Sequence, residues 1–130
     1  MVHPPTHKAS AKSILIVEDD EIILDLLAKG FEMFGLNVFK AGNGLEGWNL
    51  FNREQIDIVL TDIRMPEIDG SELSRRIRNM SPNITIAIIT GGDADVAVKL
   101  VKEGTADYFF MKPFDLKHVC KSLIAAVQTD

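Results

Sequence analysis

The stretch Ile14–Asp20, which reads ILIVEDD, decides the fold of this 130-residue chain. Its four aliphatic residues predict a short strand buried on both faces, because a half-exposed strand would alternate apolar with polar side chains. Four acidic residues, Glu18 to Glu21, follow this strand directly. The stretch is therefore typical of a parallel sheet that carries carboxylates at the carboxyl end of one strand.

Similar apolar runs recur along the rest of the chain. They are rich in β-branched and aromatic residues and lack strict polar alternation, which favours buried strands of a parallel sheet. The five predicted strands are Ile14 to Val17, Asn37 to Ala41, Ile56 to Leu60, Thr85 to Ile89 and Tyr108 to Met111.

Segments with helical spacing of apolar residues separate and follow these strands. The clearest run from Ile23 to Phe34 and from Leu116 to Val127. Three shorter helices are predicted to begin at Asn43-Gly44, at Ser71 and at Asp93, residues suited to helix N-termini. Gly35 and Gly104 stand where the first and fourth helices need a left-handed C-terminal residue.

Strand followed by helix, five times over, predicts an α/β fold: a doubly wound five-stranded parallel sheet with five helices on its two faces. The length suits a single domain, residues 14–130. Residues 1–13 are polar and proline-containing and predict a flexible tail, which favours disorder over metal binding for His3 and His7.

Composition excludes several classes of function. Fourteen basic against nineteen acidic residues give a net charge of -5, which disfavours binding to nucleic acid or an anionic membrane. The basic cluster Arg75 to Arg78 lies in a predicted helix and is interpreted as its solvated face. A single cysteine, Cys120, and the lack of a signal peptide or long apolar stretch predict a cytoplasmic protein.

Side chains of chemical interest follow four of the predicted strands. Glu18 and Asp19 follow the first, Asp62 the third and Lys112 the fifth, while Thr90 ends the fourth. Ligands bind at the carboxyl ends of strands in such sheets, so we expect these groups to converge. Oxygen ligands of this kind favour Mg²⁺, and an Asp beside that ion can act as a nucleophile toward phosphorus.

Five ordered motifs carry a family resemblance. They are Ile14–Asp20, Ala41–Gly47, Asp62–Gly70, Ile89–Gly91 and Lys112–Phe114. With them the sequence resembles the receiver domain of bacterial two-component response regulators, the CheY-like group within the flavodoxin-like folds.

The resemblance implies a strand order 2-1-3-4-5 and a set of site residues. It implies a phosphoacceptor, Asp62; Mg²⁺ ligands Glu18, Asp19, Asp62 and the Arg64 carbonyl; switch residues Thr90 and Phe109; and a phosphate-contacting lysine, Lys112. The Lys112–Pro113 peptide bond is implied to be cis. Phe109 departs from the commoner Tyr and cannot donate a hydroxyl hydrogen bond, and Gly91 stands where Ala is frequent.

The resemblance also implies a function. A sensor histidine kinase or phosphotransfer protein would phosphorylate Asp62. Phosphorylation would change the conformation of the face made by the fourth helix, fifth strand and fifth helix. That face would then bind a downstream effector or a second copy of the chain in a homodimer. No turnover of a separate substrate is expected. The chain is expected to be either a stand-alone regulator or a part of a longer one.

Three alternatives stay open at this stage. Gly42 to Gly47 matches the G-x-G-x-x-G dinucleotide fingerprint, although it follows the second predicted strand. A receiver-like module could bind partners without phosphorylation, although such modules typically lose the acceptor Asp, the acidic pair or the Lys. A dehalogenase-type phosphatase would need a second Asp where Arg64 stands.

Overall fold

The computed structural model describes residues 11–128. Its strands are β1 (Ser13–Val17), β2 (Asn37–Ala41), β3 (Ile58–Thr61), β4 (Thr85–Thr90) and β5 (Tyr108–Met111). Its helices are α1 (Glu21–Met33), α2 (Gly44–Arg53), α3 (Gly70–Met80), α4 (Ala94–Lys102) and α5 (Leu116–Val127). All neighbouring strands are parallel and their order is β2-β1-β3-β4-β5, so the predicted fold class and strand order are confirmed.

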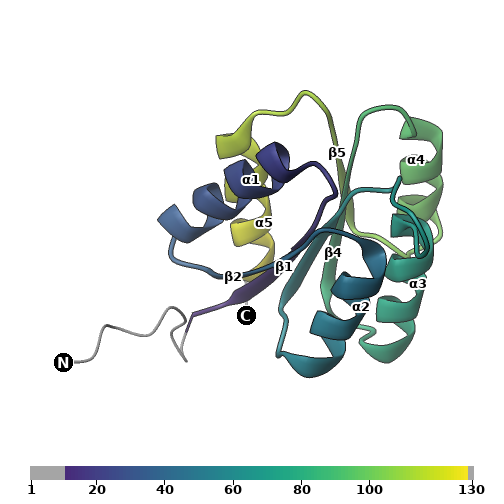
Figure 1. The fold of residues 1–130 in the computed structure, drawn as a ribbon, viewed down its shortest axis with the longest axis horizontal. Coiled ribbons are helices and arrows are strands. Elements are labelled where there is room, and N and C mark those ends of the chain that lie inside the picture. The colour runs from purple at the N-terminus through teal and green to yellow at the C-terminus, as the bar shows by residue number, and fades with distance from the viewer. Residues whose placement is uncertain (1–10, 129–130) are drawn as a thin grey trace.

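The sheet is the middle of three layers (Figure 1). Helices α1 and α5 cover one face, and α2, α3 and α4 cover the other. Successive side chains of a strand point to opposite faces, so Leu15 and Val17 pack in the core on the three-helix side while Ile14 and Ile16 pack beside α1 and α5. This two-sided burial is the reason the strands read as unbroken apolar runs.

Several strand boundaries differ from the prediction by one or two residues, among them the end of β3, which lies at Thr61 instead of Leu60. β1 begins at Ser13, which was assigned to the tail, because Ser13 pairs with Asn37 and its N–H donates to Asp57 Oδ2 at 2.8 Å. β3 begins at Ile58 instead of Ile56. Residues 1–10 of the predicted tail, with His3 and His7, lie outside the described residues.

Most helix ends follow local capping rules, and the predicted caps of α3 and α4 are the exceptions. Asp20 caps α1 and Asn43 caps α2 through their side chains, and Gly35 and Gly104 have the expected positive φ. The cap of α3 is Asp69, whose carboxylate accepts from Glu72 N at 2.9 Å. The prediction of Ser71 was wrong, since Ser71 lies inside the first turn and is buried.

No helix within residues 11–128 is both long enough and apolar enough to span a bilayer. The longest helix, α1, has 13 residues.

Candidate functional site

The carboxyl ends of four strands meet at one edge of the sheet. The ladder of hydrogen bonds continues one residue past the strands, with Asp62 N donating to Val17 O at 3.0 Å and Lys112 N to Thr90 O at 2.8 Å. Parallel pairing thereby sets Glu18, Asp62, Thr90 and Lys112 side by side, although they come from distant parts of the chain. The Lys112–Pro113 bond at this edge is cis, as the resemblance implied.

The ammonium of Lys112 joins two of the acidic residues. Its Nζ lies 2.9 Å from Asp62 Oδ2 and 2.7 Å from Glu18 Oε1. Burial acts to lower the pKa of Lys112, but its contacts with Glu18 and Asp62 outweigh burial and the pKa is raised. Lys112 therefore keeps its positive charge beside Asp62.

Three carboxylates form the acidic cluster, defined as Glu18, Asp19 and Asp62. Each offers one oxygen, and these atoms lie within 4.8 Å of one another. Glu18 is 1% exposed, and burial is the main cause that raises its pKa, with a smaller contribution from the charge of Asp62. Asp19 is exposed, so the cluster opens to solvent on one side.

The donor set of this cluster suits a hard divalent cation. Glu18 Oε2 accepts from Asp20 N at 3.1 Å, whereas Glu18 Oε1 accepts no well-aligned hydrogen bond from residues 11–128. That oxygen has only the ion-pair contact with Lys112. Mg²⁺ prefers one or two carboxylates together with water and phosphate oxygens, so these residues fit the ion.

Asp62 is held in position from both sides. Its Oδ1 accepts from Ile63 N at 2.7 Å, while Oδ2 faces Lys112. Behind it the loop between β3 and α3 folds back, with Gly70 N donating to Ile63 O at 2.7 Å. A Cβ at Gly70 would lie 1.9 Å from Asp62 O, so only glycine allows this approach. Sequence reasoning missed this role, because the sequence shows only that Gly70 follows Asp69 and does not show which backbone atoms Gly70 contacts.

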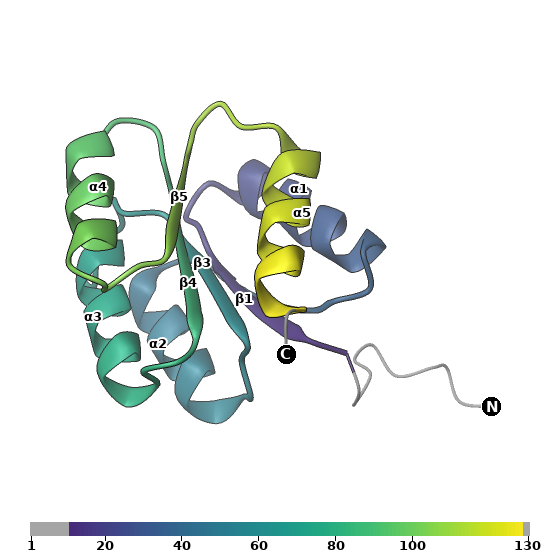
Figure 2. The same cartoon turned by 180° about the vertical axis from the view of Figure 1, so that it is seen from behind.

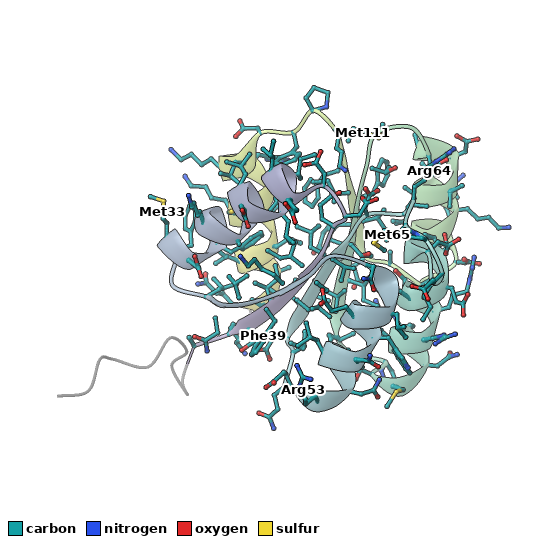
Figure 3. The ribbon with its side chains drawn as sticks, viewed as in Figure 1. Met33, Phe39, Arg53, Arg64, Met65 and Met111 are labelled. Atoms are coloured by element: carbon teal, nitrogen blue, oxygen red, sulfur yellow. The ribbon has the colours of Figure 1, made fainter. Side chains whose placement is uncertain are left out.

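Arg64 presents a side-chain contact that the sequence did not predict. Its Nε lies 2.5 Å from Asp93 Oδ2 and its Nη2 lies 2.9 Å from Asp93 Oδ1, a bidentate ion pair. Figure 3 shows Arg64 beside α4. Asp93 does stand at the N-cap position of α4, but its carboxylate makes no capping hydrogen bond to this helix, so the prediction that its side chain caps the helix was wrong.

The two predicted switch residues lie on neighbouring strands. Thr90 ends β4 and is 1% exposed. Phe109 on β5 pairs with Ile88 in the register and is 36% exposed. Because Ile88 precedes Thr90 by two residues, the Phe109 ring and the Thr90 hydroxyl lie on the same face of the sheet.

The glycines of the Gly42–Gly47 segment are explained by packing. A Cβ at Gly44 would lie 1.8 Å from Ile68 O, and one at Gly47 would lie 2.8 Å from a Val17 methyl group. The N–H of Gly42 donates to Glu46 Oε1 at 2.5 Å. These contacts bring α2 close to β1 and to the loop after β3, which replaces the dinucleotide interpretation with a structural one.

Comparisons with known proteins agree with this geometry. Residues 14–124 match the family model described as response regulator receiver domain. Over 109 residues the chain is 36% identical to Sporulation initiation phosphotransferase F of Bacillus subtilis (strain 168), covering 83% of this chain and 87% of that protein. It is 35% identical over 116 residues to Transcriptional regulatory protein GlrR of Escherichia coli (strain K12), covering 88% of this chain but only 24% of that protein.

Solved structures give the same answer. A response regulator receiver domain protein from Clostridium thermocellum superposes with a TM-score of 0.83 at 31% identity, covering 89% of this chain and 94% of that one. A CheY-like receiver domain protein from Methanospirillum hungatei JF-1 superposes with a TM-score of 0.85 at 28% identity, covering 90% of this chain and 94% of that one.

Proposed function

The chain belongs to the response regulator receiver domain family, and on this premise we propose that it is a phosphorylation-dependent switch that accepts a phosphoryl group on Asp62. One observation carries the proposal: Asp62, a nearly buried carboxylate, lies 2.9 Å from the Lys112 ammonium and within the acidic cluster. Such an arrangement activates a carboxylate toward phosphorus and balances the charge of the transferred group.

The transfer proceeds by attack of an Asp62 carboxylate oxygen on the phosphorus of a phosphohistidine. As the new O–P bond forms, the N–P bond of the donor breaks and the imidazole nitrogen keeps the electron pair. The hydrogen bond from Ile63 N orients the carboxylate, and Lys112 stands beside its second oxygen. The ammonium offsets the negative charge of the phosphoryl oxygens.

Glu18, Asp19, Asp62 and the backbone carbonyl of Arg64 would hold Mg²⁺. When bound, the ion supplies positive charge that offsets the repulsion among the three carboxylates and the phosphoryl oxygens. Glu18 supports this assignment, because it is a buried carboxylate whose Oε1 contacts the Lys112 ammonium but accepts no well-aligned hydrogen bond from the described residues, so it can take a further cation.

The response to phosphorylation runs through Thr90 and Phe109. The Thr90 hydroxyl would donate a hydrogen bond to a phosphoryl oxygen, and the Phe109 ring would turn inward. The output face consists of α4, β5 and α5, and Figure 2 shows β5 between these two helices. Val96, Tyr108 and Met111 expose apolar surface on these elements, which suits a face that changes partners.

Partners follow from the family. The phosphoryl donor would be a sensor histidine kinase or a phosphotransfer protein in the cytoplasm, and the output face would bind an effector or a second copy of the chain. The name of the Bacillus relative, a phosphotransferase, supports the exchange of a phosphoryl group with another protein. The name of the Escherichia relative, a transcriptional regulatory protein, supports a regulatory output. Turnover of a separate substrate is not part of the proposal.

Intact mass spectrometry tests the phosphoacceptor. Incubation with acetyl phosphate and Mg²⁺ should add one phosphoryl group to the native chain and none to Asp62→Asn or to a sample with the metal chelated. A folded native chain that gains no phosphoryl group would favour the alternative, a receiver-like module that binds partners without phosphorylation.

A further inference from the structure

An ion pair links the two loops that flank the candidate site. Arg64 lies in the loop after β3, two residues past Asp62, and Asp93 lies in the loop after β4, three residues past Thr90. Both guanidinium–carboxylate contacts are short, at 2.5 and 2.9 Å. The pair therefore ties together the segments that carry the proposed phosphoacceptor and the switch hydroxyl.

The contact with Arg64 keeps Asp93 from the role that its position predicts. At the starts of α1, α2, α3 and α5 the capping side chain accepts a hydrogen bond from a backbone N–H of its own helix. At α4 the Asp93 carboxylate instead faces Arg64. A capping hydrogen bond typically stabilises a helix. If Arg64 releases Asp93, the Asp93 carboxylate can therefore accept a hydrogen bond from a backbone N–H in the first turn of α4 instead.

Because the site is rich in negative charge, the partner of the Arg64 guanidinium affects how an anion can approach Asp62. The acidic cluster holds three carboxylates, and within residues 11–128 Lys112 is the cation in contact with it. Beside the cluster opens a groove of about 740 Å³, whose lining includes Asp19, Arg64 and Asp93. The groove therefore joins Asp19, a member of the acidic cluster, to the residue that carries the guanidinium.

We propose that Arg64 is a binding residue for the anionic phosphodonor that approaches Asp62 through this groove. Asp93 is a positioning residue that binds the guanidinium while no donor is present. The inference rests on the function proposed above and adds to it the regulation of donor access. The donor and Asp93 compete for one guanidinium. By linkage, each therefore weakens the hold of the other on Arg64.

Rates of phosphorylation by acetyl phosphate test the proposal. The phosphoryl group passes from acetyl phosphate to an Asp62 oxygen, and acetate leaves with the electron pair of the broken O–P bond. Asp93→Asn keeps a residue that can cap α4 and should speed the reaction about two- to fivefold at low salt. Arg64→Gln keeps the backbone carbonyl and should slow the reaction by a similar factor. The double variant should behave like Arg64→Gln.

Matched controls separate the interaction from general charge effects. Asp25→Asn removes the same charge from an exposed ion pair with Lys40, at 3.2 Å, and should leave the rate unchanged. The acceleration in Asp93→Asn should shrink as the salt concentration rises, which a purely structural effect would not do. Thermal unfolding of each variant checks that the fold is retained.

The outcomes are distinct. A native chain that takes no phosphoryl group overturns the proposed function itself. A native chain that is phosphorylated, with Asp93→Asn reacting no faster, overturns only the role of the ion pair. An acceleration by Asp93→Asn that persists in the Arg64→Gln background also overturns it, because Arg64 would then play no part.

Discussion

Lys112 Nζ lies 2.9 Å from Asp62 Oδ2, although the two residues are 50 positions apart in the chain. The contact exists because β3 and β5 both pair with β4 in parallel, so that their carboxyl ends share one edge of the sheet. The ammonium is one cation facing the three carboxylates of the acidic cluster. This excess of negative charge leads to the first prediction.

Mg²⁺ should stabilise the native chain against thermal unfolding. At a free concentration ten times the Kd, the gain in the free energy of unfolding is about 1.4 kcal/mol. Asp19→Asn removes an exposed member of the cluster and should lose most of this gain. Asp20→Asn is the matched control, because Asn also caps helices and Asp20 lies outside the cluster. Equal responses to Mg²⁺ in both variants would contradict the assignment.

Gly70→Ala should destabilise the chain, because the new Cβ would lie 1.9 Å from the Asp62 carbonyl oxygen and the backbone must shift. We expect a loss of roughly 1 to 3 kcal/mol in the free energy of unfolding, measured by urea denaturation. Gly92→Ala is the control, since no described atom would lie within 4 Å of its Cβ. Similar losses for both substitutions would count against this packing argument.

Arg78→Lys should also destabilise the chain, because the guanidinium of Arg78 joins three segments at the end of the sheet opposite the site. Its acceptors are Pro82 O at 3.0 Å, Ile84 O at 2.7 Å, Thr105 O at 3.2 Å and Asp107 Oδ2 at 2.8 Å. A lysine keeps the charge but loses the planar fork, so we expect a loss of about 1 to 3 kcal/mol in urea denaturation.

Arg53→Lys provides the comparison for this substitution. Arg53 is exposed, and its ion pair is with the adjacent Glu54 at 3.4 Å. Its replacement should change the free energy of unfolding by less than about 0.5 kcal/mol. If both substitutions have the same small effect, the hydrogen bonds of Arg78 do not hold these segments together.

Cys120 should make stability fall at high pH. Burial raises the pKa of its thiol to about 11, whereas a thiol in the unfolded chain has a pKa of about 8.5. Between these values the unfolded chain binds fewer protons, so the free energy of unfolding decreases as the pH rises through this window. Relative to Cys120→Ala, the native chain should lose up to about 1.4 kcal/mol per pH unit.

Alkylation offers a direct check of the same thiol. Within the folded chain at pH 8, Cys120 should react with iodoacetamide far more slowly than in urea, because only the thiolate is nucleophilic and the side chain is buried. Equal rates with and without urea would contradict the burial of this thiol.

Much of the fold could be predicted from local sequence. The apolar runs located the five strands because a strand covered on both faces needs side chains of one character throughout. The cap at Asn43 and the positive φ at Gly35 and Gly104 were equally local. The groups at the strand ends, including Asp62 and Lys112, followed from the rule that parallel strands share their carboxyl edge.

Only the tertiary structure decided how these groups contact one another. The pairing of Arg64 with Asp93, the approach of Gly70 to Asp62 and the choice of Asp69 over Ser71 as a cap all depend on the path of the loops. The physical reason is the distance along the chain over which each kind of interaction acts. Periodicity and capping act within one turn or strand, whereas a contact between two loops depends on the register of the whole sheet, which no short window of sequence contains.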